Sequence, residues 1–299
     1  MRPLYLALTF IIAALAILAA AYAAGLFGGS ELRVRISTTT SLYATGLLDY
    51  LADKYEGEHP GVAIDFLPVG SGQALQLAAD GEVCAVFVHA PQLEIRYIRD
   101  GVLEDHRIIA YNYFIIVGPP DDPAGVRDAA NATEAFRRIY EAGEAGRAVF
   151  ISRGDNSGTN VKELSIWKAA GLDPSGRPWY KEVGKGMADT LVMADEMRAY
   201  TLSDIGTYLK LKKDGVLKNI ELLYASSTEL INIYSAYLVT SCMGAERAQA
   251  QAFIEFVYSH QDLIGRYGVN KYGQPLFYPA EGREEELARI WESIAGAGG

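Results

Sequence analysis

The feature that most constrains the fold is a unit that occurs three times: a strand pattern, a loop of hydroxyl or glycine residues, and a helix pattern. Residues 32–36 alternate and precede five consecutive hydroxyl residues at 37–41, and residues 62–66 alternate before a Gly-Ser-Gly turn at 70–72. An apolar run at 148–151 precedes a third loop at 152–159. Such units predict an α/β fold, in which ligands bind at the carboxyl ends of the strands. We therefore expect the three loops to line one site.

The third loop, Ser-Arg-Gly-Asp-Asn-Ser-Gly-Thr, has the composition of an anion-binding loop. The helix that follows it begins with unpaired N–H groups and the positive end of its dipole. Arg153 adds a forked cation, Ser157 and Thr159 add hydroxyl donors, and Gly158 lets a ligand approach the backbone. A structural interpretation stays open, in which Ser157 or Thr159 only caps the helix and Asp155 only pairs with Arg153.

Length and charge narrow the classes of protein. The 299 residues permit one large domain or two lobes of ordinary size. The net charge of −10, with no basic cluster that includes aromatic residues, argues against a nucleic-acid surface. The four histidines are scattered and show no metal-ligand spacing. We expect neither a metal centre nor a cofactor.

The first thirty residues form a separate segment. No charged residue occurs between Arg2 and Glu31, and residues 4–27 are almost wholly apolar. About 20 such residues span a bilayer as a helix, and Ala-Tyr-Ala at 21–23 resembles a signal-peptidase site. Residues 1–30 are therefore predicted to be a signal peptide or an N-terminal membrane anchor, and the length of the run favours the anchor. Either way, the remainder should lie outside the cytoplasm.

Two further features suit an exported chain. Cys84 and Cys242 are the only cysteines, and they form either one disulfide or two small buried thiols. Residues 131–133, Asn-Ala-Thr, match the glycosylation pattern at Asn131, a triplet that often arises by chance. The residues alone do not decide either point.

Two long apolar strands divide the chain. The first, within 108–119, ends at prolines and suits a crossing from one lobe to another, and the second, at 231–239, suits the return. We predict lobe I at 31–114 and 236–299, and lobe II at 115–235. Other predicted elements are helices at 124–147, 189–197, 248–258, 261–267 and 282–296, a helix capped by Ser203 or Asp204, and an extended segment at 273–277.

Six segments carry a resemblance to one known family. The segments are Thr-Thr-Thr-Ser at 38–41, Val-Gly-Ser-Gly-Gln-Ala-Leu at 69–75, His-Ala-Pro at 89–91, Tyr-Asn at 111–112, the loop at 152–159 and Ala-Tyr-Thr-Leu at 199–202. With these segments in this order, the chain from residue 32 to 278 resembles the substrate-binding proteins of tungstate ABC transporters, within the type II periplasmic binding-protein class. The pattern Arg-Gly-x-x-Ser-Gly-Thr alone also resembles phosphate-binding proteins.

The resemblance implies a fold, a ligand and a partner. The fold is two α/β lobes joined by two crossing hinge strands, with tungstate or molybdate in the cleft and a membrane permease as partner. It implies a monomeric carrier and no enzyme activity. Asn160 departs from a family position that often holds histidine, and Lys185 from one that is usually uncharged. The implied ligands are hydroxyls or amides of Thr39, Thr40, Ser41 and Ser71 from one lobe, and Arg153, Ser157, Gly158 and Thr159 from the other.

The chemistry of the anion separates the alternatives. Tungstate and molybdate are fully deprotonated at neutral pH and need only donors, whereas phosphate keeps a proton and needs an acceptor. Asp155 is the carboxylate placed to accept, and we expect it instead to orient Arg153 and face away from the anion. A carrier of phosphate or sulfate is the alternative. A secreted serine hydrolase ranks lower, because no histidine lies near Ser157 in the sequence and the motif is not G-x-S-x-G.

Overall fold

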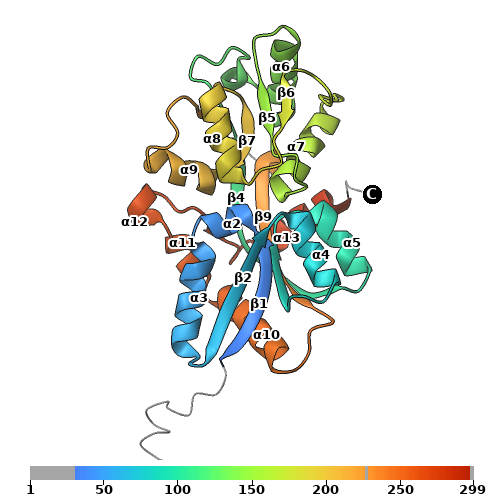
Figure 1. Ribbon diagram of the computed structural model, residues 1–299, viewed down its shortest axis with the longest axis vertical. Coiled ribbons are helices and arrows are strands. Elements are labelled where there is room, and N and C mark those ends of the chain that lie inside the picture. Colours follow the sequence, from blue (N-terminus) through green and yellow to red (C-terminus); the bar gives the residue numbers. More distant parts are fainter. Residues whose placement is uncertain (1–30, 226–227, 297–299) are drawn as a thin grey trace, which may run out of the picture.

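The computed structural model describes residues 31–225 and 228–296, and it has two α/β lobes joined by two long strands (Figure 1). The predicted N-terminal hydrophobic helix lies outside these residues. None of the helices in the described ranges is long and apolar enough to cross a membrane.

Lobe I is built on three parallel strands. β1 (Leu32–Thr39) pairs with β2 (Val62–Val69) on one side and with β3 (Ala85–Val88) on the other. Because all three run in the same direction, the loops that follow them meet at one edge of the sheet. The helices of this lobe are α2 (Thr40–Ala44), α3 (Leu47–Glu58), α4 (Ser71–Ala79), α5 (Pro91–Arg99), α10 (Gly244–Ser259), α11 (Gln261–Arg266), α12 (Val269–Tyr272) and α13 (Glu284–Gly296).

Two strands cross between the lobes, as expected. β4 (Leu103–Gly118) pairs antiparallel with β9 (Ile231–Val239) as far as Tyr113, which faces Ile231. From Phe114 onward, β4 pairs instead with β7 (Thr201–Asp204) and β8 (Glu221–Tyr224). One strand thus belongs to the sheets of both lobes. β10 (Tyr278–Pro279) pairs with β4 at the edge of lobe I.

Lobe II surrounds the second half of β4 (Figure 1). β5 (Phe150–Ser152) pairs in parallel with β6 (Tyr180–Glu182), and the loop after β5 leads directly into α7 (Gly158–Ala169). Asp204 ends β7 and caps α9 by accepting from the Thr207 amide at 2.8 Å. The lobe also contains a 3-10 turn (Val126–Asp128), α6 (Ala132–Glu144), α8 (Met187–Met197) and α9 (Ile205–Lys213).

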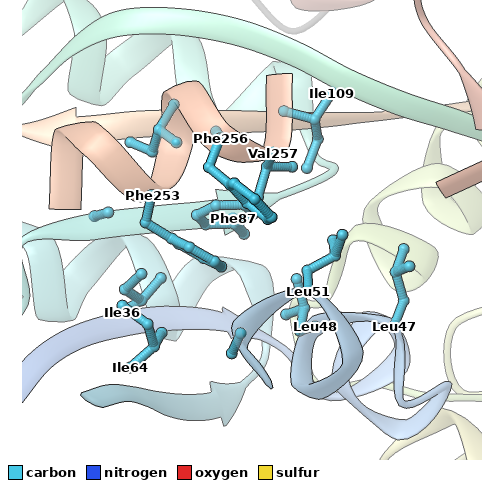
Figure 2. Packing of buried hydrophobic residues seen from close by; sticks show 14 of the residues in the cluster. Ile36, Leu47, Leu48, Leu51, Ile64, Phe87, Ile109, Phe253, Phe256 and Val257 are labelled. Atoms are coloured by element: carbon cyan, nitrogen blue, oxygen red, sulfur yellow. The ribbon is translucent and has the colours of Figure 1, made fainter. Parts of the chain in front are cut away.

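Separate hydrophobic cores support the two lobes. In lobe I, side chains of β1, β2, β3, α3 and α10 fill one space, with Phe87 and Phe253 among them (Figure 2). In lobe II, Phe136, Phe150 and Trp167 form a buried aromatic cluster. Tyr113 and Ile231 pack in a hydrophobic cluster of lobe I, whereas their neighbours Phe114 and Leu230 pack in a cluster of lobe II. The cores of the two lobes meet at the crossing strands and also at Leu209 of lobe II, which packs against the lobe I core and against a second cluster of lobe II.

Several local predictions differ from the structure. The hydroxyl run at 37–41 is not a loop, because residues 37–39 extend β1 and residues 40–41 begin α2. The helix predicted at 124–147 starts at Ala132, where the Asn131 side chain accepts from the Glu134 amide at 2.8 Å. The segment at 273–277 is flanked by α12 and the two-residue β10. β8, which is only four residues long, has no counterpart among the predicted strands.

Candidate functional site

The segments that follow β1, β2 and β5 meet where the lobes touch. The Gly158 amide of lobe II donates to the Ser71 Oγ of lobe I at 2.9 Å. Arg153 Nη2 of lobe II donates to Thr40 Oγ1 of lobe I at 3.2 Å. The predicted residues of both lobes are therefore brought together, although they are separated by 87 and 113 positions in these two pairs.

The start of α7 is closely packed and capped. The Ser157 hydroxyl accepts from the Asn160 amide at 3.3 Å, so the capping role proposed for Ser157 is present. A Cβ at Gly158 would lie 2.7 Å from the ring of His89, so only glycine permits this approach. Thr159 Oγ1 is buried and has no hydrogen-bond partner among the described residues. Since buried hydroxyls are normally paired, Thr159 is a candidate donor to a ligand.

Arg153 is the central charge of the site and is 2% exposed. Its Nη2 donates to Asp155 Oδ2 at 2.6 Å and its Nε to the Lys185 carbonyl at 3.3 Å. Asp155 Oδ1 accepts from the Ser157 amide at 3.1 Å, so both carboxylate oxygens already accept hydrogen bonds. Within the described residues, Arg153 Nη1 is buried without a partner. Asp155 therefore bonds to Arg153 and holds its guanidinium in place, as expected, and Nη1 remains for a ligand.

The hydroxyls of lobe I fall into two groups. Thr40 and Ser71 accept from lobe II, which leaves each hydroxyl proton available to donate. Thr39 Oγ1 instead accepts from the Leu42 amide at 3.2 Å and lies 3.3 Å from Ser41 Oγ. The Thr39 hydroxyl thus bonds within its own segment, and Ser41 Oγ also bonds to His89 outside it.

Two residues near the site were absent from the predicted ligands. Thr38 Oγ1, at the end of β1, is buried and unpartnered among the described residues. His89 is 2% exposed, and its Nε2 lies 3.2 Å from Ser41 Oγ. The sequence offered a signal for both, since each belongs to a segment that carries the family resemblance.

A buried carboxyl of α7 supports the loop at 152–159. Glu163 of α7 accepts from the Ser152 hydroxyl at 2.6 Å, the Tyr180 hydroxyl at 2.7 Å and the Trp167 indole at 3.0 Å. Asn160 continues this network by donating to Ser152 Oγ at 3.3 Å. Burial raises the pKa of Glu163 to about 7 against the opposing effect of these three donors.

This pKa predicts a change of stability with pH. Between pH 4.5 and pH 7 the folded protein holds a proton on Glu163 that the unfolded chain releases, so stability falls as pH rises through this window. The loss amounts to about 3 kcal/mol, at about 1.4 kcal/mol for each pH unit. Urea unfolding at several pH values should show that Glu163→Gln removes this slope. Glu196→Gln, at an exposed position of α8, should keep it; equal slopes in both variants would contradict the prediction.

The hydrolase arrangement considered around Ser157 is not assembled among the described residues. Ser157 Oγ accepts a hydrogen bond from the Asn160 amide of α7, and no described histidine makes a hydrogen bond with Ser157 Oγ. His89 bonds instead to Ser41 and Asn232. His59 Nδ1 contacts the Tyr55 carbonyl of its own helix at 2.8 Å.

Comparisons with known proteins agree with the two-lobed fold. Residues 28–261 match the family model of the PBP superfamily domain. The tungstate-binding protein TupA of Peptoclostridium acidaminophilum is 39% identical over 252 residues, which cover 82% of this chain and 84% of that protein.

Two solved structures are also similar. One is described as the tungstate ABC transporter from Geobacter sulfurreducens; it is 40% identical with a TM-score of 0.70, and the match covers 80% of this chain and 100% of that one. The other is the tungstate-binding protein TupA from Desulfovibrio alaskensis G20, at 33% identity and a TM-score of 0.68, covering 83% and 98%.

Proposed function

The chain belongs to the periplasmic-binding-protein (PBP) superfamily, and we propose that it captures tungstate or molybdate between its lobes and delivers it to the permease of an ABC importer. The relatives named tungstate-binding proteins support this ligand class. The observation that carries the proposal is a pair of buried donors without partners among the described residues, Arg153 Nη1 and Thr159 Oγ1, at one loop–helix junction. A buried cation and hydroxyl so placed suit an oxyanion.

The proposed ligands are drawn from the residues predicted from the sequence. Arg153, Thr159, Ser71 and Thr40 have protons available to donate, and Ser157 and Gly158 belong to the same helix start. Thr39 and Ser41 contribute to the same corner of lobe I. A hydroxyl-lined site of this kind replaces the water around a small anion by fixed donors.

The state of Asp155 favours an anion that carries no proton. Each of its oxygens already accepts, one from Arg153 and one from the Ser157 amide. A hydrogen phosphate ion would need an acceptor for its own proton, and an Asp155 oxygen could serve only by accepting a second hydrogen bond. Phosphate is therefore disfavoured as the ligand, whereas sulfate is fully deprotonated and would be separated from tungstate by the size of the cavity.

Capture is proposed to close two lobes about a hinge. Lys210 Nζ of lobe II donates to the Ala44 carbonyl of lobe I at 2.5 Å, and Lys271 lies 3.7 Å from Asp214, so the lobes contact each other beside the site. We place the hinge in β4 near residues 113–114 and in β9 near 230–231, slightly before the return boundary predicted at 235–236. We also propose that the protein acts as a monomer outside the cytoplasm, exported or anchored by residues 1–30.

Calorimetric titration with four anions tests the function. We expect tungstate and molybdate to bind at least tenfold more tightly than phosphate, because the site offers donors and an engaged carboxylate. Sulfate carries no proton but is smaller than tungstate, so its affinity tests whether the size of the anion decides binding. Comparable affinities for tungstate, molybdate, sulfate and phosphate would contradict the proposal, and a preference for phosphate would assign the alternative function.

A further inference from the structure

His89 joins the site to the crossing strands through both of its ring nitrogens. Nε2 lies 3.2 Å from Ser41 Oγ, and Nδ1 lies 2.8 Å from Asn232 Oδ1 on β9. Asn232 Nδ2 in turn donates to Asn112 Oδ1 on β4 at 3.0 Å. Asn112 and Asn232 face each other in the register of the two strands, and both are buried. A continuous chain of side chains thus connects Ser41 to the hinge.

The partners of Asn232 fix the position of the proton on His89. Asn232 Nδ2 uses its two protons on Asn112 Oδ1 and on the Tyr234 hydroxyl, the latter at 2.7 Å. Asn232 Oδ1 must therefore accept from His89, and His89 Nδ1 must carry a proton. Burial and then the charge of Arg153 lower the pKa of His89 to about 3, so the ring is neutral and Nε2 is an acceptor.

The direction of the remaining bonds follows from this tautomer. Because His89 Nε2 accepts, the Ser41 hydroxyl donates to it. The single proton of Ser41 is thereby used, so the Thr39 hydroxyl, which accepts from the Leu42 amide, donates its own proton to Ser41 Oγ. Both hydroxyl protons therefore point along the chain toward His89. This assignment separates Thr39 and Ser41 from Thr40 and Ser71, whose protons are available to a ligand.

We propose that His89 is a positioning residue which, as its Nδ1-protonated tautomer, ties the Thr39–Ser41 segment to the hinge strands and holds the lobe I half of the site in place. The inference rests on the proposed function, because its effect is measured on anion binding. Thr39 and Ser41 then act by keeping Thr40 in position rather than by donating their own protons to the anion. These hydrogen bonds also connect the lobe I half of the site to β4 and β9, the two strands about which the lobes would move.

Two isosteric variants separate the hydrogen bonds of the two ring nitrogens of His89. His89→Asn keeps a nitrogen near Nδ1 for Asn232 and removes the acceptor for Ser41, whereas His89→Gln keeps an acceptor near Nε2 and releases Asn232. Ser41→Ala removes the next link. Because the links form one chain, each variant should weaken tungstate binding roughly tenfold, the effect of one hydrogen bond. The double variants His89→Asn/Ser41→Ala and His89→Gln/Ser41→Ala should be no weaker than the singles.

His106 provides the matched control. It is a partly buried histidine of lobe I whose Nε2 bonds to Ser235 Oγ at 2.9 Å, and it makes no contact with the predicted ligands. His106→Asn and His106→Gln should leave tungstate affinity within about twofold of the native protein. The proposal would be overturned if both His89 variants bound tungstate with native affinity. It would also be overturned if the losses of affinity in the single variants multiplied to roughly a hundredfold in the double variants.

Nitrogen-15 NMR of the native protein tests the tautomer without a ligand or a His89 variant. Long-range proton–nitrogen correlation should show His89 protonated at Nδ1 and bare at Nε2, with its signal assigned by substituting the other three histidines in turn. Protonation at Nε2 would overturn the proposal even if no His89 variant folds. A native protein that shows this tautomer but no heat of tungstate binding would contradict the proposed function and leave the assigned tautomer intact.

Discussion

Replacing Arg153 by methionine is expected to weaken tungstate binding about a thousandfold. Arg153 is buried, and its Nη1 has no partner among the described residues, so a dianion beside it would gain a charged donor already held in place by Asp155. Removing one member of a buried charge pair costs about 3–5 kcal/mol, and about 4 kcal/mol corresponds to a factor of a thousand. Calorimetry with tungstate measures the loss. Arg153→Lys should lose less, because it keeps the charge and loses only the fork.

Part of this loss could arise from Asp155, which would remain without its partner. The double variant Arg153→Met/Asp155→Asn removes that charge and isolates the contribution of the guanidinium. Arg138→Met is the control, because Arg138 pairs with Glu134 at 2.6 Å elsewhere in lobe II. The Arg138→Met protein should bind tungstate as tightly as the native protein. A loss below about fivefold in both Arg153 variants would place the anion away from this residue.

The local features of the site could be predicted from the sequence because each follows from a short stretch. Alternating residues at 62–66 and the apolar run at 231–239 are strand patterns, and both are strands in the structure. The polar stretch at 152–159 follows β5 and begins α7, as a helix start after an apolar strand predicts. The pairing of Arg153 with Asp155 spans only two residues. These features are decided by neighbours along the chain.

The remaining features depend on partners far away in the sequence. His89 and Asn232 are 143 positions apart, and neither residue alone indicates which nitrogen of the ring is protonated. One exception is local: Thr39 caps α2 and contacts Ser41, and a run of five hydroxyl residues that looks uniform does not indicate either role. β8 is short and exists because β4 offers an edge to it. Propensity is a weak guide wherever such tertiary pairing decides the structure.

Reducing the disulfide between Cys84 and Cys242 is expected to lower the free energy of unfolding by about 3–5 kcal/mol. The sequence left the pairing open, and the structure forms it, with the two Cα atoms 5.1 Å apart. The bridge joins positions separated by 158 residues, so it encloses the whole of lobe II in one covalent ring. Closing so long a loop restricts the unfolded chain strongly, which gives about 5 kcal/mol as the entropic upper value.

Urea unfolding with and without reductant measures this effect. Cys84 precedes β3, whereas the site lies after the carboxyl ends of the parallel strands, so reduction should leave tungstate affinity within about threefold while stability falls. The double variant Cys84→Ala/Cys242→Ala should be destabilised in the same direction and should no longer respond to reductant. An unchanged urea midpoint in the reduced native protein would show that the folded cores, and not the covalent ring, restrain the two ends of lobe II. The lobe would then be expected to open and close without support from the bridge.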